Sequence, residues 1–289
     1  MKQTASNKTT YALGHAEEEL DRLSRQARVF EPFTRQLFQQ AGIAAGMRVL
    51  DVGCGSGDVA FLAAELAGPG GEVIGVDRAA AVNRATTRVQ ARHTSNVRFA
   101  EGDPAEMRFD RPFDAVVGRL VLMYYADPVD AVRKLAGHLR DGGLIVFQEF
   151  DLANARSLPP APTFERHSGW IKQALSATGA RIQLGLELHS VFLAAGLPGP
   201  SMRMDALIGG GPDVPVYELV AGVTASLLPV MEKFNLTTAA EVDLSSLAQR
   251  MQDEVVASKG VVVSPGLIGA WSRKLDTPGS EDRNGSTGR

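Results

Sequence analysis

Three glycines at every second position, Gly53, Gly55 and Gly57, follow the short apolar run Val49–Val52. An alanine-rich apolar segment continues from there to about Leu66, so the order is strand, glycine-rich turn and helix. Glycine permits a tight turn and lets a ligand approach the backbone, and the first N–H groups of the following helix can bind that ligand. The sequence therefore predicts a nucleotide-type site at the carboxyl end of this strand.

The spacing of the glycines and the acids near them indicate which nucleotide is bound. A dinucleotide fingerprint reads Gly-x-Gly-x-x-Gly, whereas the third glycine position of that pattern is Asp58 here. Asp51 precedes the glycines inside the strand, and a carboxylate there suits a cationic ligand better than a pyrophosphate. Asp77 ends a second predicted strand, 72–77, and is placed to accept hydrogen bonds from ribose hydroxyls.

Three further strands are predicted, and two of them run into polar residues. The strand 97–100 leads into Asp103, and the strand 113–118 leads into Arg119. The last strand of the series, 143–150, follows a turn that contains two glycines. The carboxyl ends of parallel strands meet at one edge of a sheet, so these polar residues are expected to gather there.

These five segments, in unbroken order over residues 45–151, resemble the class I S-adenosylmethionine-dependent methyltransferases, in the small-molecule branch of quinone-biosynthesis and bacterial natural-product enzymes. The resemblance implies an α/β fold, with a Rossmann-like, seven-stranded, mostly parallel sheet and helices on both faces. It also implies an N-terminal helical lid and helical inserts that form a substrate cap. The implied cofactor is S-adenosyl-L-methionine, which leaves as S-adenosyl-L-homocysteine.

The resemblance also implies roles for individual residues. Asp77 would bind the ribose, Asp103 would approach the adenine amino group, and the backbone of Gly118 and Arg119 would border the sulfonium. The Arg119 side chain could pair with the cofactor carboxylate or with a carboxylate of the protein. The implied cofactor-binding residues are Asp51, Gly53, Gly55, Gly57, Asp77, Arg78, Gly102, Asp103, Pro104, Gly118, Arg119 and Tyr11.

Composition limits the other classes of function. The 289 residues carry a formal charge of −3, so no basic excess favours nucleic acid as a partner. Cys54 is the one cysteine of the sequence, which excludes an internal disulfide and agrees with a reducing cytoplasm. The first residues lack the apolar core of a signal peptide, and no stretch approaches the ~20 apolar residues of a membrane span. We expect a cytoplasmic protein with no membrane partner.

The chain divides into three parts. Residues 1–40 are expected to form the helical lid, which Pro32 would break into two helices and which could mediate a homodimer. Residues 41–275 would form the methyltransferase domain, with helical inserts at about 156–181 and 212–258. Residues 276–289 are expected to be a disordered tail. Candidate ligand contacts in the lid are Tyr11, His15, Gln26 and Arg28, although an amphipathic helix simply packed on the domain is an open alternative.

The second half of the chain is expected to alternate helices and strands. Helices are predicted over 163–177, 186–195, 217–231 and 238–258, the last beginning with a capping box at Thr238 and Glu241. Residues 202–208 read as a sixth strand, and 261–271 read as the last strand, bent at Pro265.

The methyl acceptor is expected to be a small, aromatic or apolar metabolite. The segment 118–125 lacks the Asn/Asp-Pro-Pro-aromatic motif of enzymes that methylate exocyclic amines, and no carboxylate cluster indicates a metal. Methylation of carbon, such as on an indole, and of oxygen or nitrogen remain open. The candidate catalytic residues are Glu149, His167 and Tyr125, and the candidate substrate-binding residues are Tyr124, Gln148, Trp170 and His189.

Two other functions compete with methyl transfer. A non-catalytic module could keep the fold and bind S-adenosylmethionine without turnover. A nicotinamide-dependent oxidoreductase would bind NAD(P) at the same glycine turn. For the aromatic candidates, ordinary core packing is the alternative to substrate contact.

Overall fold

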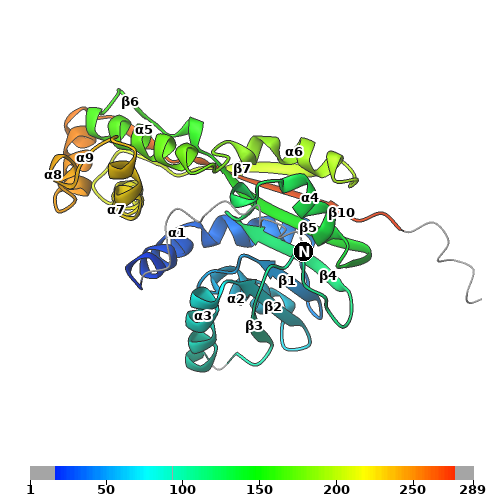
Figure 1. Cartoon of the computed structure of the whole chain (residues 1–289). Coiled ribbons are helices and arrows are strands. Elements are labelled where there is room, and N and C mark those ends of the chain that lie inside the picture. The colour runs from blue at the N-terminus through cyan, green and yellow to red at the C-terminus, as the bar shows by residue number, and fades with distance from the viewer. Residues whose placement is uncertain (1–16, 93, 277–289) are drawn as a thin grey trace, which may run out of the picture.

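The computed structural model describes residues 17–92 and 94–276 and is built around one sheet (Figure 1). The sheet has seven strands in the order β3 (Val97–Glu101), β2 (Glu72–Asp77), β1 (Arg48–Val52), β4 (Phe113–Arg119), β5 (Leu139–Asp151), β10 (Gly266–Arg273) and β7 (Ser201–Asp205). The first five strands pair in parallel, and β10 pairs antiparallel with both β5 and β7. The expected seven-stranded, mostly parallel sheet is therefore confirmed.

Helices cover both faces of this sheet. The strands alternate side chains between the two faces, so that Leu50 belongs to one core cluster and Val49 to the other. The cluster of Val49 includes residues of α1 (Glu17–Ala41) and α2 (Asp58–Ala67), and Val89 of α3 (Ala79–Arg92) packs against it. The cluster of Leu50 includes residues of α4 (Pro128–Ala136) and α6 (Leu184–Ala194). Burial on both faces explains why β1 and β2 read as nearly continuous apolar runs.

Four helices and a small sheet form a cap beside the carboxyl edge of the main sheet (Figure 1). The helices are α5 (Pro162–Ala177), α7 (Val216–Lys233), α8 (Ala239–Val242) and α9 (Leu247–Ala257). The small antiparallel sheet has the order β6 (Arg156–Leu158), β9 (Val261–Val263) and β8 (Ile208–Gly209). Helices α5, α7 and α9 pack against one another, so the two predicted inserts meet in space.

The structure corrects the expectation for Pro32. This proline lies inside the single helix α1 and does not divide it. A proline removes one helical hydrogen bond, and burial of neighbouring side chains outweighs that loss here. Phe30 is 3 % exposed on one side of the proline and Leu37 is fully buried on the other. Tyr11, His15 and residues 277–289, which carried expectations for the lid and the tail, lie outside the described residues.

Three predicted elements of the second half are divided in the structure. The helix predicted over 238–258 is two helices, α8 and α9, because Asp243 adopts a left-handed conformation with φ 44° between them. The strand predicted over 202–208 is divided into β7 and β8. The last predicted strand is divided too, since β9 belongs to the small sheet and only β10 joins the large one. Thr238 does cap α8, and its hydroxyl accepts a hydrogen bond from the Glu241 N–H.

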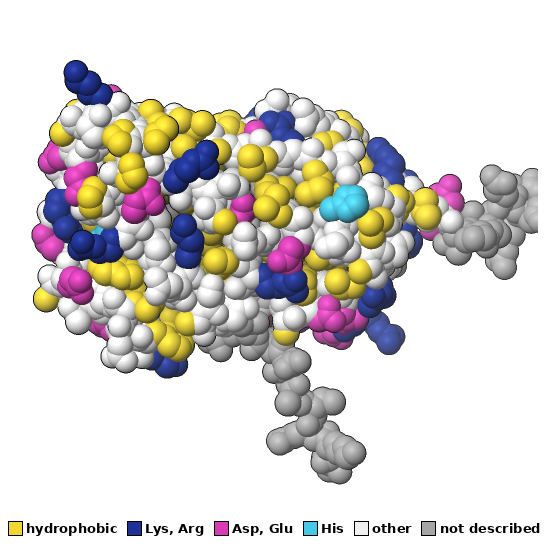
Figure 2. All heavy atoms as spheres, turned by 90° about the horizontal axis from the view of Figure 1, so that it is seen from above, with side chains coloured by type: hydrophobic (Ala, Val, Ile, Leu, Met, Phe, Trp, Pro, Cys, Tyr) yellow, Lys and Arg dark blue, Asp and Glu magenta, His cyan; other side chains and the backbone are white. Residues whose placement is uncertain are grey.

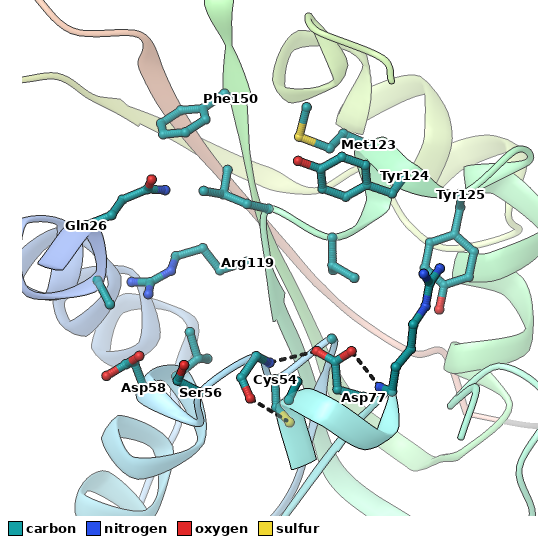
Figure 3. Close-up of a pocket in the computed structure, with 18 of the residues that line it drawn as sticks. Gln26, Cys54, Ser56, Asp58, Asp77, Arg119, Met123, Tyr124, Tyr125 and Phe150 are labelled. Carbon is teal, nitrogen blue, oxygen red and sulfur yellow. Dashed lines mark hydrogen bonds between the residues drawn. The ribbon is translucent and has the colours of Figure 1, made fainter. Parts of the chain in front are cut away.

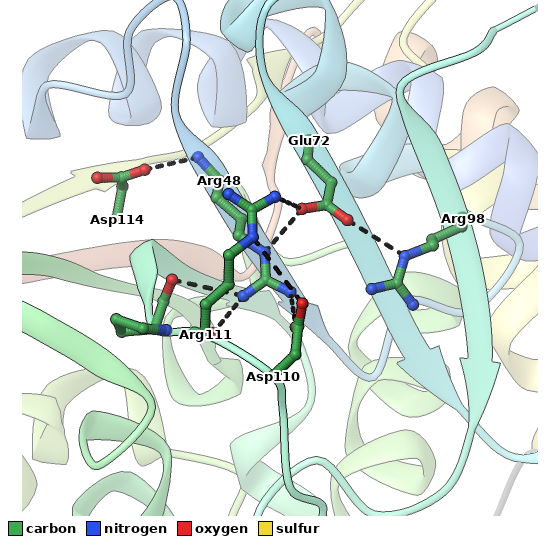
Figure 4. Close-up of polar contacts among 7 residues, drawn as sticks. Arg48, Glu72, Arg98, Asp110, Arg111 and Asp114 are labelled. Atoms are coloured by element: carbon green, nitrogen blue, oxygen red, sulfur yellow. Dashed lines mark hydrogen bonds and ion pairs between the residues drawn. The ribbon is translucent and has the colours of Figure 1, made fainter.

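A network of charges ties the strands together where they begin, at the edge away from the cap (Figure 4). Arg48, which is 4 % exposed, pairs with Glu72 at 2.7 Å and with Asp110 at 2.6 Å. Glu72 also binds Arg98 and Arg111. A nearly buried arginine needs such partners, because an unpaired buried charge is costly. The network therefore fixes the strand starts and leaves the opposite edge for a ligand.

One face of the molecule shows no separation of charge by sign. In Figure 2 acidic, basic and apolar side chains are interspersed over the face seen from above. No helix within 17–92 and 94–276 combines the length and the apolar character that crossing a membrane requires.

Candidate active site

One cavity of about 970 Å³ opens at the carboxyl edge of the main sheet and extends under the cap. Its walls come from the glycine turn after β1, from the ends of β2 to β5, and from helices α1, α5 and α7. This is the place where open α/β sheets bind ligands. Figure 3 shows the cavity with Asp77 and Cys54 on one side and Tyr124 and Phe150 on another.

The turn between β1 and α2 can only be made by glycine at its crowded positions. Gly53 has φ 65°, and a Cβ built on it would lie 2.3 Å from Val121 Cγ2. Gly57 has φ 87°, and a Cβ there would lie 2.6 Å from the Phe99 ring. The turn thus holds a left-handed backbone against side chains that leave no space. Gly53 and Gly55 line the cavity, whereas Gly57 lies behind it and supports the turn.

Two carboxylates follow β2 and β3 and line the same cavity. Asp77 is held by two backbone donors, since Gly55 N donates to Oδ2 at 2.8 Å and Arg78 N donates to Oδ1 at 2.6 Å. Asp103 accepts from the Tyr125 hydroxyl at 3.3 Å. Arg78, Gly102 and Pro104 also line the cavity. Fixed carboxylates beside a glycine turn fit the hydroxyl and amino donors of a nucleoside.

The turn region holds two charged groups with shifted pKa values, the buried Asp51 and the half-buried Arg119. Asp51 is 1 % exposed, and neither of its oxygens has a hydrogen-bond partner among the described residues. Burial raises the pKa of Asp51 well above its ordinary value, and the positive charge of Arg119 opposes that rise. Burial also lowers the pKa of Arg119, against the attraction of Asp58 and Asp51.

The Arg119 side chain points into the cavity toward α1 (Figure 3). Its Nη1 donates to Thr34 Oγ1 at 3.0 Å, and it forms no ion pair with any residue within the described ranges. A half-buried cation without an ion-pair partner favours an anionic group of a ligand. Asp51 does not line the cavity, so Arg119 is the member of this pair that a ligand can reach, and it fits the carboxylate of the methionine part of S-adenosylmethionine.

The segment after β4 forms another wall of the cavity. It contains the 3-10 turn η1 (Leu122–Tyr124), and Val121, Met123, Tyr124 and Tyr125 all line the cavity. Burial and the adjacent Asp103 raise the pKa of Tyr125 above its ordinary value. The Tyr125 hydroxyl therefore stays protonated at neutral pH and acts as a hydrogen-bond donor. Gly118 does not line the cavity, because Phe147 and Val121 cover it.

An apolar part of the lining comes from helices α1, α5 and α7, from the end of β5 and from the turn that follows it. We call these residues the acceptor wall: Phe30, Phe150, Leu152, Ile171, Leu175, Val216, Leu219, Val220 and Val223. Polar side chains border this wall at Arg22 and Gln26 of α1 and at Ser264. An apolar wall with few polar groups at its margin is typical of a site for a small organic molecule.

Five of the predicted catalytic and substrate residues do not line the cavity. Glu149 and Gln148 are fully buried in β5, where Glu149 binds backbone N–H groups and Gln148 accepts from Thr34. His167 packs its ring edge-on against Trp170, with centroids 4.8 Å apart, inside the cap. His189 is exposed on α6. Tyr124 and Tyr125 are the members of those two sets that reach the cavity.

Of the candidate contacts on α1, Gln26 lines the cavity, whereas Arg28 is exposed. The sequence reasoning missed most of the acceptor wall, including Phe150, Leu152, Ile171 and Leu175. A signal for part of it exists in α7, where Val216, Val220 and Val223 recur at helical spacing and form one face. No three His, Cys, Asp or Glu side chains in the described part of the chain come close enough to hold a metal ion.

Comparisons with known proteins agree with this geometry. The profile of a family described as "Methyltransferase domain" matches residues 43–182. Nocamycin O-methyltransferase of Saccharothrix syringae is 37 % identical over 118 residues, which are 40 % of this chain and 42 % of that protein. Aklanonic acid methyltransferase DauC of Streptomyces sp. (strain C5) is 33 % identical over 155 residues, which are 52 % of this chain and 70 % of that protein.

Among solved structures, the fold is similar to phosphoethanolamine N-methyltransferase 2 of Haemonchus contortus, solved with phosphomonomethylethanolamine and S-adenosylhomocysteine. The TM-score is 0.53 at 15 % identity, and the match covers 85 % of this chain and 53 % of that one. The chain thus spans less than two thirds of the length of the nocamycin enzyme and of the Haemonchus contortus enzyme.

Proposed function

Because this chain belongs to the methyltransferase domain family, we propose that it transfers a methyl group from S-adenosylmethionine to a small, largely apolar acceptor. The observation that carries the proposal is a single cavity that joins the glycine turn and its carboxylates to the acceptor wall. S-adenosylmethionine, when bound, supplies a methyl group that its sulfonium already activates for in-line displacement. The work left to the protein is to bind, to orient and to exclude water.

We call the part of the cavity around the glycine turn, Asp77, Asp103 and Arg119 the donor half, because it would hold the methyl donor. We call the part bounded by the acceptor wall the acceptor half. The donor half offers a group for each part of the cofactor. Asp77 and Asp103 are acceptors for the hydroxyl and amino groups of the nucleoside, and the turn at Gly53 and Gly55 leaves space beside them. Arg119 would hold the carboxylate of the methionine part. Arg78, Gly102 and Pro104 would complete the wall around the nucleoside.

The acceptor half supports an aromatic or aliphatic substrate. The nine residues of the acceptor wall are all apolar, and two of them, Phe30 and Phe150, present aromatic rings. Their rings meet edge-on with centroids 5.5 Å apart. No side chain of the wall can act as a base, so the acceptor atom must be a good nucleophile already or lose its proton to solvent or to a polar side chain elsewhere in the cavity. Carbon, nitrogen and oxygen acceptors all meet this condition, and an electron-rich ring such as an indole is one example.

The relatives support a natural product as acceptor. Both bacterial relatives reported above are named for methylation of such compounds, nocamycin and aklanonic acid. We extend to this chain only what they share, a small natural product as the methyl acceptor. The formal charge of −3 and the mixed surface of Figure 2 support free small molecules, rather than nucleic acids, as the partners.

The proposal is tested by binding and turnover in sequence. S-adenosylmethionine, S-adenosylhomocysteine and NADH are titrated side by side by calorimetry, and the protein is then incubated with methyl-labelled S-adenosylmethionine and a panel of aromatic metabolites. We expect the first two to bind and the label to appear in a small product. Binding of NADH alone would identify an oxidoreductase. Binding of S-adenosylmethionine without a labelled product from the panel or from cell extract would identify a non-catalytic module.

A further inference from the structure

Glu149 is a fully buried carboxylate that faces the backbone of the segment after β4. Its Oε1 accepts hydrogen bonds from Val121 N at 2.9 Å and from Leu122 N at 2.7 Å. Its Oε2 has no partner among the described residues. Because Glu149 does not line the cavity, it cannot remove a proton from an acceptor there. Its contacts indicate a different role.

The segment that Glu149 holds is the wall between the donor and acceptor halves. We call residues 119–125 the central strip, and all of them except Leu122 line the cavity. Within the strip Leu120 has φ 55°, a conformation that a branched side chain seldom adopts. Leu120 N donates to the Gln148 carbonyl at 2.8 Å. The Glu149 carboxylate binds the two N–H groups that follow, so the strained residue is held from both sides.

The strip also touches the glycine turn. Val121 Cγ2 occupies the space that a Cβ on Gly53 would need, and Val121 Cγ1 lies 3.0 Å from the corresponding point on Gly118. A change in the position of Val121 must therefore change the turn that faces the donor. Glu149 acts on the donor half through this chain of contacts, without touching the ligand.

Two opposing effects set the ionisation of Glu149. Burial raises its pKa to about 7, and the N–H groups of Leu122, Val121 and Met123 oppose the rise because they stabilise the ionised form. The charged side chains nearby on β4 and β5 have other partners, since Arg119 binds Thr34 and Asp151 binds Ala153 N and Asn154. On β10 the residue in register with Glu149 is the apolar Ile268, and on α6 Gly185 packs against the Glu149 backbone.

We propose that ionised Glu149 is a positioning residue that fixes the central strip in its binding conformation. The affinity of the protein for S-adenosylmethionine and S-adenosylhomocysteine then increases as Glu149 becomes ionised. The inference rests on the donor half of the proposed site. An ionised acceptor makes stronger hydrogen bonds to N–H groups than a neutral one. Deprotonation of Glu149 therefore tightens the strip and the turn that Val121 supports.

The test measures S-adenosylhomocysteine affinity from pH 6 to pH 8, one unit on either side of the pKa of about 7. For the wild-type protein the dissociation constant should fall roughly three- to tenfold over this range, as expected for strengthening one or two hydrogen bonds. Glu149→Gln should keep a weaker affinity that does not change across the same range. A purely structural role predicts a lower melting temperature for Glu149→Gln but parallel pH profiles, and that result would overturn the proposal.

Asp114→Asn is the matched control. Asp114 accepts a hydrogen bond from Arg48 N at 2.7 Å, so it also holds backbone, but it lies at the start of β4, away from the cavity. This variant should keep the wild-type pH profile. If it loses the profile as well, the effect is global and the proposal is wrong.

Hydrogen exchange supplies a readout that needs neither variant nor ligand. In the wild-type protein, the protection of residues 119–125, corrected for intrinsic exchange, should rise between pH 6 and pH 8 while that of β1 and β2 stays constant. Unchanged protection of the strip would refute the proposal even if Glu149→Gln does not fold. Because both readouts require no methyl acceptor, a failure to find a product would bear on the proposed function alone.

Discussion

Thr34 Oγ1 on α1 donates a 2.8 Å hydrogen bond to Gln148 Oε1 on β5, and the two residues are 114 positions apart. Both side chains are fully buried. The same hydroxyl accepts a hydrogen bond from Arg119, the cation that lines the cavity. One oxygen atom therefore links α1 to β5 and to Arg119.

We expect Thr34→Val to weaken both folding and cofactor binding. Valine has nearly the same shape but leaves Gln148 Oε1 and Arg119 without their partner, which costs ~1–3 kcal/mol for a buried polar group. Urea unfolding should report that loss, and calorimetry should report a weaker affinity for S-adenosylhomocysteine. Thr34→Ser keeps the hydroxyl and should restore both values. Equal affinity in the valine and serine variants would show that Thr34 does not orient Arg119.

Gly53→Ala should reduce cofactor affinity more than a glycine substitution elsewhere. The added Cβ would lie 2.3 Å from Val121 Cγ2, so either the turn or the central strip must shift. Gly46→Ala is a matched control, because Gly46 also has a positive φ, of 83°, but has open space where the Cβ would be. Both variants should lose stability from backbone strain. Only Gly53→Ala should raise the dissociation constant of S-adenosylhomocysteine, and an equal effect of both would contradict this prediction.

A large side chain on the acceptor wall should impair the acceptor half of the cavity and leave the donor half intact. Val220 lies on α7 and is 8 % exposed, so Val220→Trp is expected to fill the acceptor half. Product formation should then fall steeply, while S-adenosylhomocysteine affinity stays close to that of the wild type. Val256→Trp, on the exposed side of α9, serves as the control and should change neither value. Loss of cofactor affinity in Val220→Trp would place the donor in the half assigned here to the acceptor.

The cap should lose stability in acid because of His167. Burial, with help from Arg250 and Arg166, lowers the pKa of His167 from 6.5 to about 4. Between these values the unfolded chain binds a proton that the folded chain does not, so the free energy of unfolding falls as pH falls from 6.5 to 4. Between pH 7 and pH 5 the loss should reach up to about 2 kcal/mol.

His167→Gln should flatten this part of the stability curve, measured by urea unfolding at both pH values. His189→Gln, at an exposed histidine of α6, should leave the curve unchanged. A wild-type curve that is already flat over this range would show that folding does not lower the pKa of His167.

The donor half was predictable because its signals are local. Each signal is a strand followed directly by a glycine or an acid, as in 49–57 and 72–77, and parallel strands bring those ends together in any open α/β sheet. Gly53, Asp77, Asp103 and Arg119 accordingly line one cavity.

The acceptor half depends on packing between segments that are distant in the chain. Ile171 and Val220 are ordinary apolar residues of amphipathic helices, and only the packing of α5 on α7 brings them to one cavity. Sequence reasoning favoured polar and aromatic residues such as His167 and Trp170, which lie on the same helix and contact each other inside the cap. Pro32 was misjudged for a similar reason, because the burial that keeps α1 continuous is a tertiary effect.

The continuity of the cavity has a thermodynamic consequence. A molecule in one half becomes part of the wall for a molecule in the other half, so each ligand completes the binding surface of its partner. Binding free energies are then coupled, and the coupling must be equal in both directions. An acceptor that raises the affinity for S-adenosylhomocysteine by some factor will itself bind more tightly by that factor when S-adenosylhomocysteine is present. A search for the natural acceptor can therefore saturate the protein with each candidate compound and measure the gain in affinity for S-adenosylhomocysteine. This measurement does not require methyl transfer.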